Sequence, residues 1–76
     1  MQDKEVAKVI GENVKKYRRE RKYTQKRLAK EVGLADHSAI SKLETGKFLP
    51  SVTLLLAISR ALNIEFTCLF IGVRTL

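Results

Sequence analysis

The residues best suited to chemistry lie in the stretch that follows Asp36. Four polar side chains occur there within six positions: His37, Ser38, Ser41 and Lys42. The neighbouring apolar residues sit at helical spacing, so a helix here would bury them and expose these four polar residues. Imidazole, hydroxyl and ammonium groups can hydrogen-bond to the edges of bases. The stretch is therefore suited to reading a nucleic acid.

Catalysis and metal binding fit these residues poorly. Asp36, His37 and Ser38 are the residue types of a catalytic triad, but consecutive side chains on a helix diverge and cannot form a relay. Metal ligation by His37 and Cys68 would require further ligands that the sequence does not supply. We expect no enzymatic activity, no metal and no cofactor.

Charge is distributed unevenly along the chain. The 76 residues carry a net charge of +7, and 45% of them are apolar, which is enough for a core. Positive residues crowd one half of the chain, against Glu20 alone: Lys15, Lys16, Arg18, Arg19, Arg21, Lys22, Lys26, Arg27 and Lys30. This asymmetry favours a polyanionic partner, with nucleic acid first and an anionic membrane surface second.

The sequence also indicates a location. A single cysteine, Cys68, excludes an internal disulfide and fits a reducing compartment. The N-terminus has no apolar signal core, and no apolar run approaches the roughly 20 residues of a membrane span. We expect a cytoplasmic protein without a membrane partner.

Apolar spacing predicts an all-α chain that forms one domain, residues 1–76. Five helices are expected, over residues 2–22, 24–33, 36–46, 52–62 and 65–71. One face of the fourth helix, expected to be buried, would be formed by Val52, Leu55, Ile58, Ser59 and Leu62. Gly11 interrupts the first helix at a cost of about 1 kcal/mol relative to alanine, so it either marks a close helix contact or is tolerated.

Capping residues set the bounds of these helices. Thr24, Asp36 and Ser51 can each accept hydrogen bonds from the free amides of a helix start. Gly33 and Gly46 can end the second and third helices, because glycine adopts the left-handed conformation without a Cβ penalty. Residues 24–46 thus read as two short helices joined by a tight turn.

Several segments together resemble the phage repressor and Cro type of helix-turn-helix domain, an XRE-like family. These segments are IGENVKKYRRER, TQKRLAKEVG, AISKLETGK, LPSVTLLLAISRALNI and FTCLF, and they cover most of the chain from Ile10 to Phe70. The resemblance implies five helices around one core, with a helix-turn-helix at residues 24–46. It also implies that the helix at 39–43 enters the DNA major groove while the preceding helix crosses the backbone.

The resemblance assigns roles to individual residues. Gln25 corresponds to a glutamine that contacts a phosphate and braces the recognition helix. His37, Ser38 and Lys42 match positions that touch base edges, and Ser41 lies beside them.

Further roles concern stability and the DNA backbone. Arg18 and Glu44 match an arginine and a glutamate that pair between the first and third helices. Lys26, Arg27 and Lys47 are predicted to contact phosphates. Three further basic residues lie too far round the first helix to touch DNA: Lys15, Lys16 and Arg19. We expect them to form a solvated face that only steers DNA.

The turn departs from the family pattern. From Gly33 to Glu44 the chain has one residue more than the usual spacing, which the cap at Asp36 places among Gly33, Leu34 and Ala35. Leu34 is expected to point into the core. An insertion at the start of the recognition helix would instead shift the base-reading set by one residue.

Surplus apolar residues suggest an interface. We expect a two-fold homodimer through the fourth helix and the C-terminal segment, with recognition helices about 34 Å apart. Its expected interface residues are Leu54, Ala57, Ala61, Phe70, Ile71, Val73 and Leu76. The competing explanation is that the C-terminal segment folds over its own domain.

The predicted function is sequence-specific binding of double-stranded DNA by a transcriptional regulator, a repressor at a palindromic operator. An alternative is a protein-interaction module, such as the antitoxin of a toxin pair, that binds its partner through the fourth helix and the C-terminal segment. A basic membrane binder ranks third, because the apolar face of the first helix is needed for the core.

Overall fold

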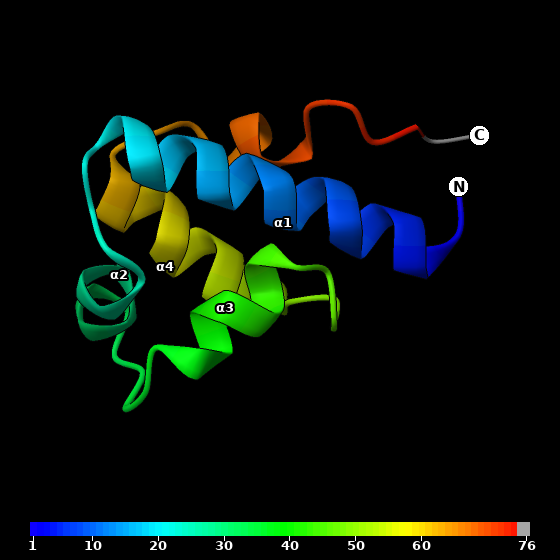
Figure 1. Cartoon of the computed structure of the whole chain (residues 1–76). Helices are drawn as coiled ribbons and strands as arrows, with labels where there is room; N and C mark the ends of the chain where they lie inside the picture. Colours follow the sequence, from blue (N-terminus) through cyan, green and yellow to red (C-terminus); the bar gives the residue numbers. More distant parts are fainter. Residues whose placement is uncertain (75–76) are drawn as a thin grey trace.

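The chain folds into four α-helices and one 3₁₀ helix joined by short turns (Figure 1), as a computed structural model of residues 1–74 describes it. The α-helices are α1 (Asp3–Glu20), α2 (Gln25–Glu31), α3 (Ser38–Glu44) and α4 (Val52–Leu62), and the 3₁₀ helix is η1 (Phe66–Phe70). The described residues contain no strand, so the all-α prediction is confirmed. The fifth helix is a 3₁₀ turn rather than the α-helix expected over residues 65–71.

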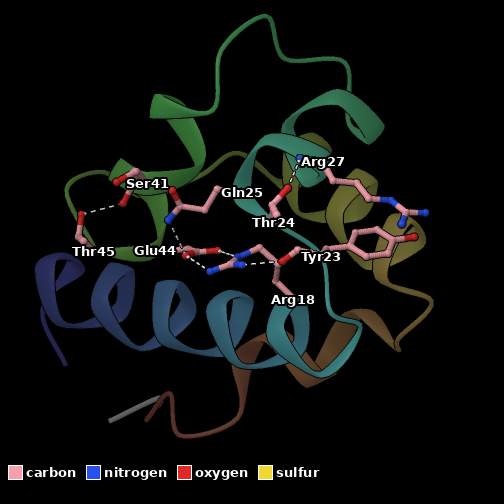
Figure 2. Close-up of polar contacts among 8 residues, drawn as sticks. All are labelled: Arg18, Tyr23, Thr24, Gln25, Arg27, Ser41, Glu44 and Thr45. Atoms are coloured by element: carbon pink, nitrogen blue, oxygen red, sulfur yellow. Dashed lines mark hydrogen bonds and ion pairs between the residues drawn. The ribbon is translucent and has the colours of Figure 1, made fainter.

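Helix α1 runs along the length of the molecule (Figure 1). Helices α2, α3 and α4 lie on one side of it, and the C-terminal segment returns along the other side (Figures 1 and 2). Among the described residues, no helix is long and apolar enough to cross a bilayer.

Every element contributes to one apolar core. Its largest fully buried side chains come from α1, α2, α3, α4 and η1: Ile10, Val14, Leu28, Ile40, Leu43, Ile58, Leu62 and Leu69. Complete burial of a large apolar side chain stabilises the fold by roughly 1.5 to 3 kcal/mol. The two short helices of seven residues would be marginal alone, so packing on this core holds them in place.

Side-chain caps begin two of the helices, as predicted. The hydroxyl of Thr24 accepts from the Arg27 amide at 3.0 Å, and the hydroxyl of Ser51 accepts from the Leu54 amide at 3.1 Å. Gly33 and Gly46 follow α2 and α3 with φ angles of +80° and +75°. At α1 the same left-handed turn is made by Lys22, with φ of 60°, so this helix ends before the expected residue.

Two expectations about the helices are wrong. Asp36 is not the N-cap of α3, because that position belongs to His37; the Asp36 carboxylate instead accepts from the Ser38 amide at 3.0 Å, one residue farther out. Val52 is 63% exposed, because it is the first residue of α4 and the buried face of that helix starts at Leu55.

The C-terminal segment lies against its own chain. The Asn13 amide of α1 donates to the carbonyls of Leu69 and Ile71 at 2.9 and 2.8 Å. Phe70 and Val73 pack against the core, whereas Ile71 remains 58% exposed. The expected interface residue Leu76 lies outside the described residues.

Candidate nucleic-acid interface

Helix α3 has an apolar inner face and a polar outer face. Ile40 and Leu43 are completely buried. On the other side Ser38 and Lys42, one helical turn apart, are exposed, and Ser41 beside them is half-buried. His37 is exposed at the N-cap, just outside the helix. The four predicted base-reading residues thus run from the N-cap of α3 to its last turn, on the side away from Ile40 and Leu43.

Close packing against α1 fixes the position of α3. A Cβ atom on Gly11 would collide with the carbonyl oxygen of Leu43 and lie 2.8 Å from that of Glu44. A Cβ on Gly46 would lie 2.8 Å from the Cα of Lys8. The two helices therefore meet backbone to backbone, and Gly11 marks a close contact rather than a tolerated interruption.

An ion pair between Arg18 and Glu44 lies at this junction (Figure 2). The Arg18 Nε donates to one carboxylate oxygen of Glu44 at 2.6 Å, and its Nη2 donates to the other at 3.1 Å. The two residues are only 9% and 5% exposed. This is the pairing between the first and third helices that the family resemblance implied.

Gln25 extends the ion pair into a network of three helices. Its side-chain amide donates to Glu44 Oε1 at 3.0 Å, and Arg18 Nη1 donates to the Tyr23 carbonyl at 2.7 Å (Figure 2). The network joins α1, the start of α2 and the end of α3, and it leaves no buried side-chain polar atom without a partner among the described residues. Gln25 is half-buried and lies in the first turn of α2. Its hydrogen bond to Glu44 thereby braces α3.

The turn between α2 and α3 spans residues 32–37. Leu34 packs against the core, as predicted, and its amide donates to the Ala29 carbonyl at 2.8 Å. Helix α3 is uninterrupted from Ser38 to Glu44. The spacing of Ser38, Ser41 and Lys42 is therefore the ordinary spacing of a helix.

Electrostatics at the start of α3 centre on Asp36. The hydrogen bond from the Ser38 amide holds the pKa of its carboxyl below the usual value, with smaller contributions from His37 and Lys42. His37 Nδ1 lies 3.5 Å from Asp36 Oδ1. Lys26 and Lys30 of α2 line the same depression of about 520 Å³ as this pair.

The predicted phosphate-binding residues Lys26, Arg27 and Lys47 come from α2 and from the turn after α3. Lys26 and Lys47 are exposed, the latter directly after Gly46 at the end of α3. Arg27 is exposed too, but its guanidinium carbon lies 4.0 Å from the centre of the Tyr23 ring, and its side chain points away from α3 (Figure 2). The structure thus gathers Gln25 with Glu44 but sets Arg27 apart.

Two contacts were missed by reasoning from the sequence. The Thr45 hydroxyl donates to the carbonyls of Ser41 and Lys42 at 2.9 and 3.1 Å, which satisfies the C-terminal end of α3. A threonine directly after a helix was the available signal. The Tyr23 carbonyl that accepts from Arg18 had no signal, because backbone groups are not distinguished by residue type.

Comparison with known proteins agrees with this geometry. The helix-turn-helix family matches residues 14–67. The restriction-modification controller protein C.AhdI from Aeromonas hydrophila has a similar structure, with a TM-score of 0.79 and 30% sequence identity over 84% of this chain and 96% of that one. No curated protein matches the chain significantly.

The family match covers more than half of the chain, and the neighbour covers most of it at a high structural similarity. The matched residues 14–67 include both α2 and α3. The chain therefore belongs to the XRE-like helix-turn-helix family and is a DNA-binding transcriptional regulator.

Proposed function

We propose that the protein is a repressor that binds a palindromic operator as a homodimer, with α3 reading bases in the major groove. The observation that carries this proposal is the construction of α3. Its inner face is locked by Gly11 and by the network of Arg18, Gln25 and Glu44, while its outer face presents uncommitted polar groups. A rigidly held polar helix is what base reading requires, because hydrogen bonds to base edges depend on position.

The dimensions and residue types suit the groove. An α-helix with its side chains is about 10 to 12 Å across, and the major groove of B-DNA is about 12 Å wide. Lys42 can donate to the O6 and N7 acceptors of guanine, and Ser38 and Ser41 can hydrogen-bond to several bases. His37, at the N-cap, would contact a guanine or a phosphate at the edge of the site.

Phosphate contacts would hold the helix in register. Gln25 and Lys26 in the first turn of α2, and Lys47 after the end of α3, would contact the DNA backbone. Arg27 would reach a phosphate at the periphery, with its guanidinium supported by the Tyr23 ring. The net charge of +7 would steer the protein to DNA.

Dimerisation is supported by apolar surface on α4 and the C-terminal segment. Leu54, Ala57 and Ala61 each keep part of their surface exposed, and Ile71 is 58% exposed. A second copy would cover these residues and place two recognition helices about 34 Å apart, one turn of DNA. Phe70 and Val73 would contribute only their outer edges, because they already pack on their own core.

Selection from a random duplex pool tests sequence reading. We expect enrichment of one palindromic motif by the wild-type protein, and loss of that enrichment in Ser38→Ala and Lys42→Ala. Arg21→Ala, at an exposed position in the turn after α1, is the control and should enrich the same motif. Retention of DNA without any enriched motif would show binding by charge alone and would contradict the proposal.

Sedimentation tests the dimer. At tens of micromolar without DNA, we expect the mass of two chains, and Ala57→Arg should reduce it to one because a charge would be buried in the interface. The mass of one chain for the wild type would instead favour the alternative that α4 binds another protein. Co-purification of a second small protein would then support the antitoxin-like function.

A further inference from the structure

A second basic surface lies beside the recognition helix. Five residues line a depression of about 510 Å³ between α1 and the end of α3: Glu12, Lys15, Lys16, Arg19 and Glu44. We propose that Lys15 and Arg19 bind backbone phosphates of DNA that flanks the bases read by α3. The inference rests on the DNA-binding function proposed above and extends its contact surface to α1. It reverses the expectation that these residues only steer DNA.

The position of the two side chains follows from the packing of α1. Gly11, Lys15 and Arg19 are four residues apart, so they occupy successive turns along one side of the helix. Gly11 lies against the carbonyls of Leu43 and Glu44. Lys15 and Arg19 therefore continue the side of α1 that touches α3, and both are exposed.

The charges in the depression favour an anion. Glu44 does not neutralise the basic residues, because its carboxylate already binds Arg18 and Gln25 and is 5% exposed. Within residues 1–74, neither Lys15 nor Arg19 forms an ion pair. Glu12 is the single exposed carboxylate in the lining, against three cations, so the depression has an excess of positive charge.

One of the three cations has another contact. The ammonium of Lys16 lies 5.2 Å from the centre of the Tyr17 ring. Lys15 and Arg19 are the side chains free to turn toward a ligand.

The depression is continuous with the proposed DNA surface. Glu44, which lines it, is the last residue of α3 and binds Gln25 at the start of α2 (Figure 2). Helix α1 passes directly beside this network, on the side opposite the C-terminal segment (Figure 2). A DNA strand that contacts the start of α2 would thus reach α1 across Glu44. A phosphate there adds affinity without sequence information.

The test compares two double variants of equal charge. Lys15→Gln/Arg19→Gln removes two positive charges from the depression, and Arg21→Gln/Lys22→Gln removes two from the turn that follows α1. Binding of the duplex enriched by the wild-type protein, with flanking base pairs on both sides, is measured across a salt series. All four positions are exposed, so both variants should unfold at the same urea concentration as the wild type.

The salt dependence separates the two variants. Each phosphate neutralised contributes about −0.9 to the slope of log K against log salt, so the Lys15/Arg19 variant should lose up to about 1.8 per chain. The control should lose much less, and both should enrich the same motif as the wild type. Equal slopes in the two variants would overturn the inference while leaving the proposed function intact. Failure of the wild type itself to enrich a motif would overturn both.

Discussion

The carboxylate of Glu44 is held by Arg18 through both of its oxygens, with Nε–Oε2 and Nη2–Oε1 distances of 2.6 and 3.1 Å. Gln25 donates a third hydrogen bond to the same carboxylate at 3.0 Å. One glutamate at the end of the recognition helix thereby connects α1, α2 and α3. The stability of the fold and the placement of the face that we propose reads DNA therefore depend on the same few atoms.

Breaking this ion pair should destabilise the protein strongly. Glu44→Gln leaves the Arg18 guanidinium buried without its counter-charge, and we expect a loss of roughly 3 to 5 kcal/mol in the free energy of unfolding. Urea unfolding measures it. The matched control is Arg18→Met/Glu44→Leu, in which both charges are replaced by apolar groups and much of the loss should be recovered. Equal stability of Glu44→Gln and the wild type would show that the pair contributes nothing.

Adding a single methyl group at Gly11 should separate α1 from α3. In an exposed helix Gly→Ala stabilises by up to about 1 kcal/mol, but here the Cβ would collide with backbone oxygens that cannot rotate away. We expect Gly11→Ala to destabilise by about 1 to 3 kcal/mol, as overpacking does. Affinity for the operator should fall as well, because α3 would be displaced.

Gly33 provides the comparison for this variant. A Cβ there would meet nothing within 4 Å, so Gly33→Ala is affected only by the left-handed φ of +80°. The expected loss is about 1 to 2 kcal/mol, with operator affinity unchanged once the protein is folded. A Gly11→Ala variant as stable as the wild type would contradict the close packing of α1 on α3.

The caps of α2 and α4 should differ in their effect on DNA binding. Thr24→Ala and Ser51→Ala each remove one cap hydrogen bond, and each should reduce stability by about 1 kcal/mol. Only α2 carries Gln25 in its first turn, so Thr24→Ala should also weaken operator binding. Thermal unfolding and operator titration measure the two effects. Equal affinities of the two variants would show that the start of α2 does not position a DNA contact.

Asp36 should make stability depend on pH in the acid range. Its folded pKa is lowered by the hydrogen bond from the Ser38 amide, so its ionised form favours the folded state. This contribution is present above the pKa of the unfolded chain and is lost as the pH falls through the lower folded pKa. An NMR titration of the Asp36 carboxyl measures the pKa directly. Asp36→Asn should remove this part of the acid dependence, and an ordinary pKa in the folded protein would refute the contact.

Most of the fold followed from the pattern of apolar residues. The apolar spacing located all four α-helices, and Thr24 and Ser51 were identified as caps because their side chains act within three residues. The predicted N-cap of α3 was one residue too early. The reason is that an aspartate can accept from the first amide of a helix, here that of Ser38, either at the N-cap or just before it. Local chemistry of this kind limits how far the bounds of a helix can be predicted.

The site could be predicted only in part. Family resemblance supplied Arg18, Gln25 and Glu44, which are 7 to 26 positions apart and have no local signal that unites them. The sequence left the meaning of Gly11 open, because close backbone packing depends on the partner helix. It also placed Lys15 on a solvated face, and only the three-dimensional neighbourhood of Glu44 shows the depression that it lines.

The central claim is that two copies of α3 read adjacent major grooves of one operator. Methylation protection of guanine N7 on the enriched duplex tests it most directly, because N7 lies in the major groove where Lys42 is expected to bind. We predict two protected patches on the same face of the DNA, about 10 base pairs apart, both lost in Lys42→Ala. Tight binding without protection of guanine N7, or protection of a single patch, would contradict the account.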